Sequence, residues 1–369
     1  MSELVLVTGG AGFIGRYVCK ALLEKGYRVR ALDALIDQVH GGAGRPADLD
    51  PEVELIIGDI RDEAETLRAL SGADHVIHLA AEVGVGQSMY AVDRYVSVNE
   101  HGTAVLFQQL IDRPVKRVVV ASSMSIYGEG LYRDADGKVH EEVVRGSRNA
   151  DGSWDPLDDQ GRPLVPEPTP EWKRPGLNSV YALNKYVQER LTLTLCQAYC
   201  MESAALRLWN VYGPGQALSN PYTGVLAIFA SRLSNGQPPL IFEDGEQRRD
   251  FVDVKDVADA FVLALEHPKA NGGVFNVASG VSRSVNEVGA CLGEAMGKRI
   301  PPEITGKCRT GDIRHCIPDI TKIEAELGFK AKGDFTQGLA ELAEWVARQE
   351  AQDRVSEASR ELEARGLVA

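Results

Sequence analysis

The glycine-rich run near the start of the chain restricts the possible folds more than any other feature of the sequence. Residues 5–15 read V-L-V-T-G-G-A-G-F-I-G, an apolar run that breaks into glycines. Glycine is needed there for the tight turn from strand to helix, for close approach of a phosphate to the backbone, and for packing of the helix on the strand. The free N–H groups and the dipole at the helix N-terminus favour an anion. The run therefore predicts a strand, a turn and a helix that bind a dinucleotide.

The next part of the chain supports this interpretation. A second apolar stretch, 27–32, ends at Asp33, which follows Gly15 by 18 residues. An acidic residue at about this distance can bind the ribose hydroxyls of the adenosine. Because its charge would repel a 2′-phosphate, we expect NAD rather than NADP.

Apolar runs at 4–7, 27–32, 53–57, 75–79 and 117–121 alternate with helical patterns, which is typical of a parallel, doubly wound sheet. We expect the cofactor to cross the carboxyl ends of these strands. For Asp59 two roles remain open: a contact to the adenine amino group, or the N-cap of the helix that follows. The expected cofactor-binding residues are Gly9, Gly12, Phe13, Ile14, Gly15, Asp33, Asp59, Ile60, Leu79, Ala80, Ala81, Asn99, Ser122, Tyr181 and Lys185.

Length and composition exclude several classes of function. The 369 residues are enough for a large α/β unit with a smaller lobe. A net charge of −13 argues against binding to nucleic acid or to an anionic membrane surface, so an anionic substrate would need local arginines. We expect no membrane span and no signal peptide, because no run of 18 apolar residues and no basic, apolar leader occurs. The six cysteines form no C-x-x-C pair, so we expect no metal site, no disulfide framework and a cytoplasmic location.

Tyr181 and Lys185 are four residues apart at the start of an expected helix, 181–201, and so share one helix face. A lysine ammonium beside a phenol stabilises the phenolate and lowers its pKa. Tyr181 is therefore a candidate general acid or base near neutral pH. The alternative, an ordinary surface Tyr–Lys pair, agrees less well with a dinucleotide motif in the same chain.

The segment 129–178 is rich in Asp, Gly, Pro, Arg and Glu and has almost no periodicity. It is too long for an ordinary connection between a strand and a helix. We therefore expect either a lid or an elaborated substrate loop. His140 is its only soft metal ligand, so we expect no metal there.

Together these motifs resemble those of the extended short-chain dehydrogenase/reductases, in particular the nucleotide-sugar epimerases and dehydratases, over roughly residues 4–347. The resemblance implies an α/β fold with a Rossmann-type doubly wound parallel sheet and a smaller α/β substrate-binding lobe. It implies an NAD-binding domain over 1–210, which includes the insertion 129–178 and the catalytic helix 181–201, and a lobe mainly formed by 211–347. We expect the tail, 348–369, to be a frayed or solvent-facing helix. The family also forms homodimers through a four-helix bundle, here with the helices near 101–112 and 181–201.

The resemblance also implies roles for individual residues. In the family a serine or threonine near the end of the fifth strand acts with the tyrosine and lysine, which gives Ser123, Tyr181 and Lys185 as catalytic residues. Segments 247–254 and 309–315 resemble loops at the sugar diphosphate, and arginine suits this ligand because its planar fork binds two oxygens at once. The implied substrate-binding residues are Gly84, Val85, Ser123, Met124, Tyr181, Asn210, Tyr222, Thr223, Phe242, Arg249, Arg309 and Asp312.

The choice of reaction depends on two positions. In the family's 4,6-dehydratases an Asp-Glu pair follows the catalytic Ser/Thr, whereas this chain has Met124 and Ser125. A thioether cannot transfer a proton, so we expect a 4-epimerase that oxidises C4 transiently with NAD. Segments 82–90, 122–130 and 219–224 resemble those of bacterial dTDP-L-rhamnose 4-epimerases, which favours a dTDP-6-deoxyhexose as substrate. A UDP-glucose/galactose-type 4-epimerase, a UDP-glucuronate decarboxylase, a 4,6-dehydratase and a catalytically silent NAD-binding regulator remain open.

Overall fold

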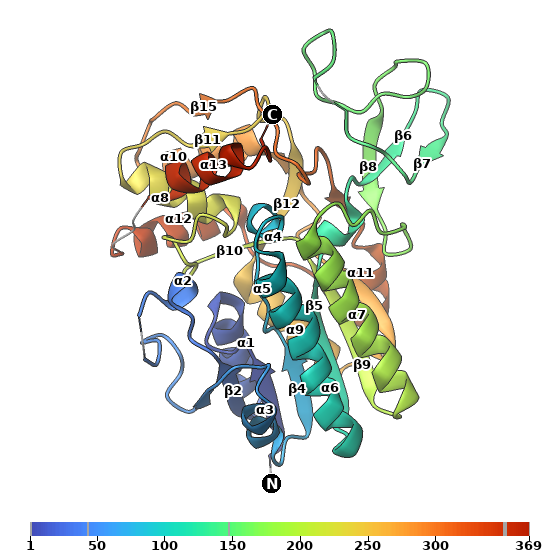
Figure 1. Cartoon of the computed structure of the whole chain (residues 1–369), viewed down its shortest axis with the longest axis vertical. Helices are drawn as coiled ribbons and strands as arrows, with labels where there is room; N and C mark the ends of the chain where they lie inside the picture. The colour runs from blue at the N-terminus through green and yellow to red at the C-terminus, as the bar shows by residue number, and fades with distance from the viewer. Residues whose placement is uncertain (1, 43, 147, 350–352, 369) are drawn as a thin grey trace.

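The computed structural model describes residues 2–42, 44–146, 148–349 and 353–368. Within these residues the central element is a seven-stranded parallel sheet with the order β13-β9-β5-β4-β1-β2-β3 (Figure 1). Its strands are β1 (Leu4–Thr8), β2 (Arg28–Asp33), β3 (Glu54–Ile57), β4 (His75–His78), β5 (Arg117–Ser123), β9 (Glu202–Leu208) and β13 (Gly273–Val277). The order changes direction between β1 and β4, and ligands of such sheets bind outside the carboxyl ends at that point. The predicted doubly wound sheet is confirmed.

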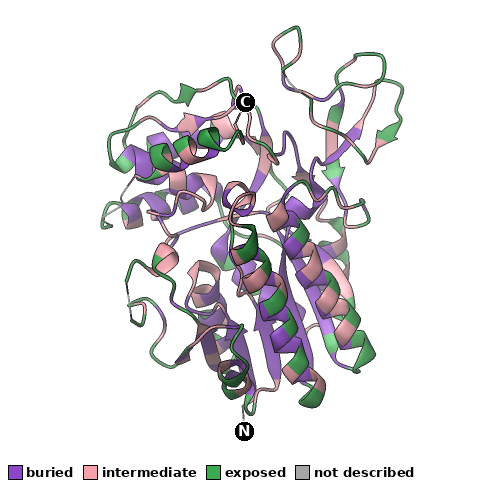
Figure 2. Cartoon of the chain, in the orientation of Figure 1, coloured by how far each residue is buried: buried purple, intermediate pink, exposed green. Residues whose placement is uncertain are grey.

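Both faces of this sheet are covered by helices. In β1, Val5 and Val7 enter one core, with α1 (Phe13–Glu24) and α9 (Val254–Glu266), whereas Leu6 enters the core on the other face. That second core contains residues of α3 (Glu63–Leu70) and α6 (Gly102–Asp112), beside which α7 (Val180–Ala198) lies. Because both faces are buried, the central strands β1 and β5 bury every residue and carry runs of successive apolar residues rather than an alternating pattern (Figure 2).

Short helices connect the sheet to the site. α2 (Asp37–His40) follows β2, and α11 (Thr321–Leu327) packs near β13. Between β4 and α6 lie α4 (Val85–Ser88), α5 (Val92–Val96) and one turn of π-helix (Ser97–His101). A 3₁₀ turn, Met124–Tyr127, follows β5 directly.

The smaller lobe has its own apolar core. Helices α8 (Val225–Ser234), α10 (Val285–Ala295) and α12 (Phe335–Val346) pack around Phe229, Leu233 and Phe251. The strands of this lobe are β10 (Asn210–Tyr212), β11 (Leu240–Ile241), β12 (Arg248–Asp253), β14 (Ser282–Ser284) and β15 (Glu303–Ile304). Since α9, β13 and α11 return to the central sheet, the chain after residue 211 contributes to both lobes.

The insertion 129–178 carries more regular structure than its sequence indicates. Its strands β6 (Leu131–Arg133), β7 (Val139–His140) and β8 (Val165–Thr169) form a small sheet that ends on β16 (Ile317–Pro318), far away in the sequence. Beyond this sheet the loops are largely exposed (Figure 2).

The C-terminal segment, expected to be a frayed or solvent-facing helix, forms a helix that packs along one face and is exposed along the other. α13 (Val355–Ala364) buries Ala358 and Leu362, which are four residues apart and so share one face. After it, the Leu367 carbonyl accepts the N–H of Thr310 at 2.9 Å. The tail therefore packs on both lobes, because Arg365 also lies over the ring of Tyr90.

No helix in the part of the chain that the structure describes is long and apolar enough to cross a membrane.

Candidate active site

The glycine turn after β1 brings two backbone segments, the turn itself and the start of the following helix, into direct contact. Gly9 has a φ of +70°, and a Cβ built on Gly15 would lie 2.3 Å from the carbonyl oxygen of Gly9. Only glycine allows helix α1 to begin so close to the turn. No side chain caps this helix at Gly12, so its first N–H groups face the space that an anion would fill.

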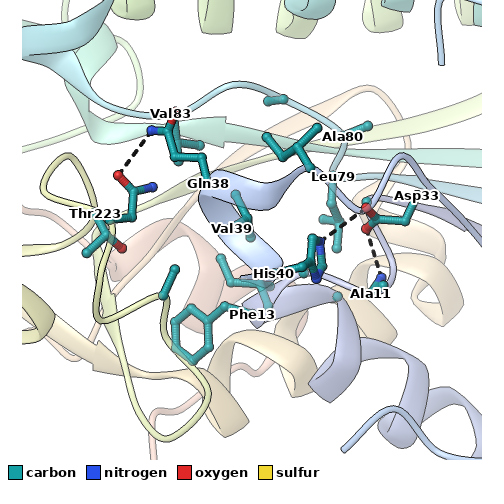
Figure 3. A pocket seen from close by; sticks show the side chains of 18 of the residues that line it. Ala11, Phe13, Asp33, Gln38, Val39, His40, Leu79, Ala80, Val83 and Thr223 are labelled. Carbon is teal, nitrogen blue, oxygen red and sulfur yellow. Dashed lines mark hydrogen bonds and ion pairs between the residues drawn. The ribbon is translucent and has the colours of Figure 1, made fainter. Parts of the chain in front are cut away.

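Asp33 is held rigidly beside this turn (Figure 3). Its Oδ2 accepts the N–H of Ala11 at 3.0 Å and its Oδ1 accepts the N–H of Leu35 at 3.0 Å. His40, on α2, places Nε2 at 3.3 Å from Oδ1. The carboxylate is thus oriented toward the cavity before any ligand binds.

The structure excludes one of the two roles considered for Asp59. The helix cap is Asp62, whose side chain accepts the N–H of Glu65 at 3.0 Å. Asp59 instead pairs with Arg61 at 2.6 Å, and this hydrogen-bonded pair holds the pKa of Asp59 below its usual value. The cap role is therefore wrong, and the adenine contact stays a prediction.

A cavity of about 1660 Å³ lies at the carboxyl ends of the central strands. Its wall contains almost all of the expected cofactor-binding residues, from five different strand ends and from α7: Gly9, Gly12, Phe13, Ile14, Gly15, Asp33, Asp59, Ile60, Leu79, Ala80, Ala81, Ser122, Tyr181 and Lys185. Asn99 is different, because it is buried and its amide binds the backbone of Glu82, with an Oδ1 distance of 2.7 Å and an Nδ2 distance of 3.1 Å. The residues fit an NAD molecule: an uncapped helix, a turn without side chains and a carboxylate for the ribose.

The wall also holds side chains that the sequence did not reveal. Trp345, Gln349 and Arg354 come from the end of α12 and from the chain before α13. No local pattern predicts them, since they reach the cavity only through the packing of the two lobes.

Lys185 is the end of a buried chain of polar groups. Its ammonium donates to Gln188 Oε1 at 2.7 Å, and Gln188 Nε2 lies 2.9 Å from Thr103 Oγ1 and 3.1 Å from the ring of His78. His78 continues to Thr8 Oγ1 at 2.7 Å, at the end of β1. Burial lowers the pKa of Lys185 to about 7 and that of His78 to about 3. His78 is therefore neutral at physiological pH, and Lys185 titrates there.

Tyr181 and Ser123 meet at the cavity wall. Helix α7 begins one residue before Tyr181, with Ser179 as its N-cap, and the Tyr181 N–H donates to Ser88 Oγ at 3.0 Å. Burial raises the pKa of the Tyr181 phenol, and a hydrogen bond with Ser123 acts in the opposite direction. The expected lowering of this pKa by Lys185 is absent, because the ammonium is bound to Gln188 instead.

A buried ion pair joins β9, the neighbour of the strand that carries Ser123, to the helix that carries Tyr181. Arg207 on β9 binds Glu189 on α7 through two hydrogen bonds, at 2.9 and 2.7 Å. Glu189 also accepts the hydroxyl of Ser122 at 2.6 Å. Both ionic side chains are almost fully buried, so removal of either one alone would leave an unpaired charge in the core.

The residues expected around the sugar lie in two groups. Ser123, Tyr181 and Thr223 line the large cavity. Tyr222 lines a neighbouring hollow of about 640 Å³ that α13 partly covers, and its hydroxyl lies 2.6 Å from that of Tyr90. Gly84, just before Val85 and α4, touches the same tyrosine: a Cβ there would lie 2.8 Å from Tyr222 Cβ.

Met124 and Asn210 form a second contact near Ser123. The Asn210 amide donates to the Asp250 carbonyl at 2.9 Å and lies 3.8 Å from the Met124 sulfur. Met124 is buried, and Ser125 is bonded to Ser123 through a hydroxyl–hydroxyl contact of 2.9 Å. Neither residue after Ser123 presents an acid or a base.

The residues expected at the diphosphate gather in one cluster outside the described wall of the large cavity. Arg309 lies over the Phe242 ring at 4.6 Å and pairs with Asp312 at 2.9 Å. Burial alone would raise the pKa of Asp312, but Arg309, Arg249 and Arg145 bring it below its ordinary value. The guanidinium of Arg249 donates to the carbonyl oxygens of Arg248, Ile313 and Arg314.

The sheet order, the glycine turn and the Ser-Tyr-Lys group at one cavity define a dinucleotide-dependent enzyme of the short-chain dehydrogenase/reductase class. The chain belongs to the NAD dependent epimerase/dehydratase family, whose model matches residues 5–150 and 156–278. The cofactor of this family is NAD, as the sequence predicted.

Individual relatives are similar over nearly the whole chain. A dTDP-L-rhamnose 4-epimerase from Burkholderia thailandensis is 35% identical over 351 residues, which cover 94% of this chain and 95% of that protein. The structure of a UDP-glucose 4-epimerase from Thermotoga maritima with UDP-glucose has a TM-score of 0.77 and 31% identity, covering 94% of this chain and 99% of that one. The structure of a UDP-glucose 4-epimerase from Thermus thermophilus with NAD has a TM-score of 0.73 and 30% identity, covering 94% and 100%.

Proposed function

We propose that this protein is a nucleotide-sugar 4-epimerase that acts by transient oxidation at C4. The observation that carries the proposal is the placement of Ser123, Tyr181 and Lys185 on the wall of the cavity that also contains the glycine turn and Asp33. A regulator that only binds NAD has no need of all three groups.

We propose that side chains of the protein carry out the proton transfer. Ser123 orients the C4 hydroxyl, and the Tyr181 phenol takes its proton and later returns it. When bound, NAD would accept the hydride from C4 of the sugar and then return it. A phenol with a raised pKa is protonated at neutral pH, so turnover requires a cation near it. Lys185, on the same face of α7 and at the same cavity wall, is the cation that we propose, and this role requires its ammonium to leave Gln188 for the phenol.

Epimerisation is favoured over water elimination by Met124 and Ser125. Elimination across C5 and C6 needs an acid and a base beside the sugar. Met124 is buried against the Asn210 amide, and Ser125 is bonded to Ser123. This region therefore supports oxidation and reduction at C4 without loss of water.

We propose a dTDP-6-deoxyhexose such as dTDP-L-rhamnose as the substrate. The support is the 35% identity to a dTDP-L-rhamnose 4-epimerase over 94% of this chain. A UDP-hexose is the second candidate, since a similar structure contains UDP-glucose.

The test is NMR of the purified protein with NAD and, in separate tubes, dTDP-L-rhamnose, dTDP-glucose, UDP-glucose, UDP-N-acetylglucosamine and UDP-glucuronate. The expected result is a 4-epimer at equilibrium without net NADH. Loss of water or of CO₂ from any sugar would contradict the epimerase proposal and indicate a dehydratase or a decarboxylase. No change with any sugar, while NAD stays bound, would favour the regulator.

We also propose a cytoplasmic homodimer. All six cysteines are free thiols, which suits a reducing compartment. The outer side of α7 presents Leu183, Val187 and Leu191, which are exposed or half-buried and could pack against a second copy. Light scattering during gel filtration should give twice the mass of the chain, and a monomer at micromolar concentration would contradict this proposal.

A further inference from the structure

The insertion is attached to the segment that carries Arg309 and Asp312. Glu129, its first residue, accepts the backbone N–H groups of Arg314 at 2.6 Å and of His315 at 3.2 Å. Its last strand, β8, pairs with β16, which follows the same segment. The insertion therefore fixes the backbone of the predicted diphosphate loop at two places.

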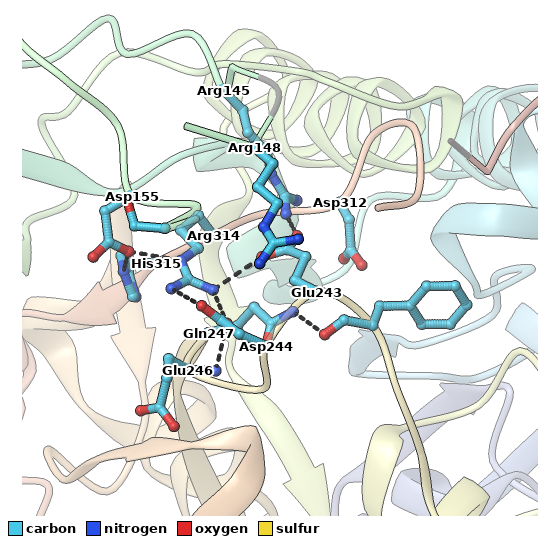
Figure 4. A network of polar contacts seen from close by, with 12 residues as sticks. Arg145, Arg148, Asp155, Glu243, Asp244, Glu246, Gln247, Asp312, Arg314 and His315 are labelled. Atoms are coloured by element: carbon cyan, nitrogen blue, oxygen red, sulfur yellow. Dashed lines mark hydrogen bonds and ion pairs between the residues drawn. The ribbon is translucent and has the colours of Figure 1, made fainter. Parts of the chain in front are cut away.

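A buried ionic network makes a third attachment (Figure 4). The Arg314 guanidinium, 2% exposed, binds Asp155 of the insertion at 2.8 Å, Glu243 at 3.0 Å and Asp244 at 2.5 and 3.0 Å. Asp155 also lies 3.0 Å from His315 Nε2. One guanidinium thus joins three carboxylates, two of which follow Phe242 directly.

Arg145, also from the insertion, adds a second cation to these carboxylates. Its side chain is 11% exposed and pairs with Glu243, which is 1% exposed (Figure 4). Arg145 is also one of the three arginines whose charges act on Asp312, with Arg309 and Arg249. The insertion thus brings a guanidinium to the cluster of Phe242, Arg309 and Asp312.

The three arginines of the cluster differ in how readily they can change partners. Arg249 is engaged by three backbone carbonyls, which are fixed in place. Arg145 and Arg309 are each paired with a carboxylate side chain, Glu243 and Asp312. A diphosphate can replace a carboxylate on a guanidinium, because both accept two parallel N–H bonds.

We propose that the insertion completes the nucleotide end of the substrate site: Arg145 binds the diphosphate of the substrate together with Arg309, and Asp155 with Arg314 positions the loop that carries them. The ligand is a nucleoside diphosphate, with or without a sugar. The inference rests on the proposed function only for the identity of this ligand class. It assigns to the insertion a contact with substrate, where a purely structural role would give it only contacts with the protein.

The direct test is calorimetric binding of dTDP and of UDP to the NAD-loaded protein. Arg145→Gln is expected to lower the affinity for whichever nucleotide binds more tightly by at least tenfold, and to leave the NAD content unchanged. The matched control is Arg174→Gln, in the same insertion, because Arg174 is 74% exposed and pairs only weakly with the exposed Glu142 at 3.2 Å. Unchanged nucleotide affinity in Arg145→Gln would overturn the proposal.

A second variant covers the case in which Arg145→Gln does not fold. Arg145→Lys keeps the charge but loses the planar fork, so it should bind the diphosphate more weakly than the wild type. Binding equal to that of the wild type would mean that Arg145 does not contact the diphosphate through its fork. Because no turnover is required, a protein that binds dTDP but epimerises no sugar would contradict the proposed function and leave this inference intact.

The positioning role of Asp155 needs a kinetic measurement. Asp155→Asn is expected to raise KM for the sugar nucleotide by about three- to tenfold while kcat stays near its original value, because the loop is displaced and the chemistry is not. Asp136→Asn, at an exposed carboxylate of the insertion, should change neither value. A lower melting temperature with an unchanged KM would assign Asp155 a structural role only and contradict the proposal.

Discussion

The two ends of the site are built differently. The cofactor end is shaped by backbone and by residues close in sequence: a glycine turn, an uncapped helix and Asp33 on the next strand. The nucleotide end is built from long side chains of distant segments, including the insertion, the turn after Phe242 and the loop 309–315. The first is preformed, whereas in the second the arginines already hold carboxylates. The cofactor end therefore binds without rearrangement, and the nucleotide end must exchange partners.

The largest expected effect lies where the two ends meet. Tyr181→Phe should lower kcat by about 10³-fold or more, because the phenol is the proposed carrier of the proton. The NAD content of the purified variant should be unchanged, since the ring remains in the cavity wall. Tyr186→Phe, on the same helix, is the control and should be fully active. Near-normal turnover in Tyr181→Phe would remove Tyr181 from the mechanism.

At the cofactor end, the addition of a single methyl group should destabilise the fold and abolish NAD binding. Gly15→Ala places a Cβ 2.3 Å from the Gly9 carbonyl oxygen, and neither backbone segment can move freely. We expect a loss of stability of about 3 kcal/mol and loss of bound NAD, measured by urea unfolding and by absorbance. Gly146→Ala in the insertion meets no atom within 4 Å and should change neither. Equal stability of the two variants would mean that the turn is not preformed.

At the nucleotide end, removal of one arginine should affect binding alone. Arg309→Gln is expected to raise KM for the sugar nucleotide about 10-fold or more, which corresponds to about 1.4 kcal/mol, with NAD affinity unchanged. Steady-state kinetics and NAD titration measure both. If NAD affinity fell while KM rose, the two ends would be coupled and the comparison above would be too simple.

The smallest expected effect is a pH dependence of stability. His315 and Arg314 hold the pKa of Asp155 at about 2, below its ordinary value of 3.8. Since the folded pKa is the lower one, Asp155 stabilises the fold above about pH 4, and this contribution is lost as the pH falls toward 2. Urea unfolding of the wild type and of Asp155→Asn should therefore differ at pH 6, and the difference should shrink as the pH falls toward 2. A constant difference would mean that the Asp155 charge does not contribute.

The same contrast explains what the sequence could predict. β1, α1, Asp33 and helix Glu63–Leu70 follow from local patterns, and they are present as expected. Asp59 and Asp62 show the limit of such reasoning, because two acids before one helix compete for the cap and only geometry decides. Asn99 was expected at the cofactor, but its amide binds the Glu82 backbone, a contact that no spacing predicts.

Residues that act across the fold were not predictable. Arg145 lies in a segment without periodicity, and its partner Glu243 is almost a hundred residues away in the chain. The tail was expected to be exposed because its few apolar residues are sparse, yet two of them are enough to seat α13. In both cases the contact depends on the tertiary structure, and no local sequence pattern predicts it.

The backbone pairing of the Arg309 loop with the C-terminal segment has a consequence for synthesis. Arg309 forms a bridge with Val368, which leaves the ribosome 145 residues after Thr223, the last wall residue before the smaller lobe's helices. Chains fold from the N-terminus as they emerge. Most of the residues that line the dinucleotide pocket thus leave the ribosome long before the Arg309 loop can pair with the C-terminal segment, so the nucleotide end of the site is the last part that can be completed.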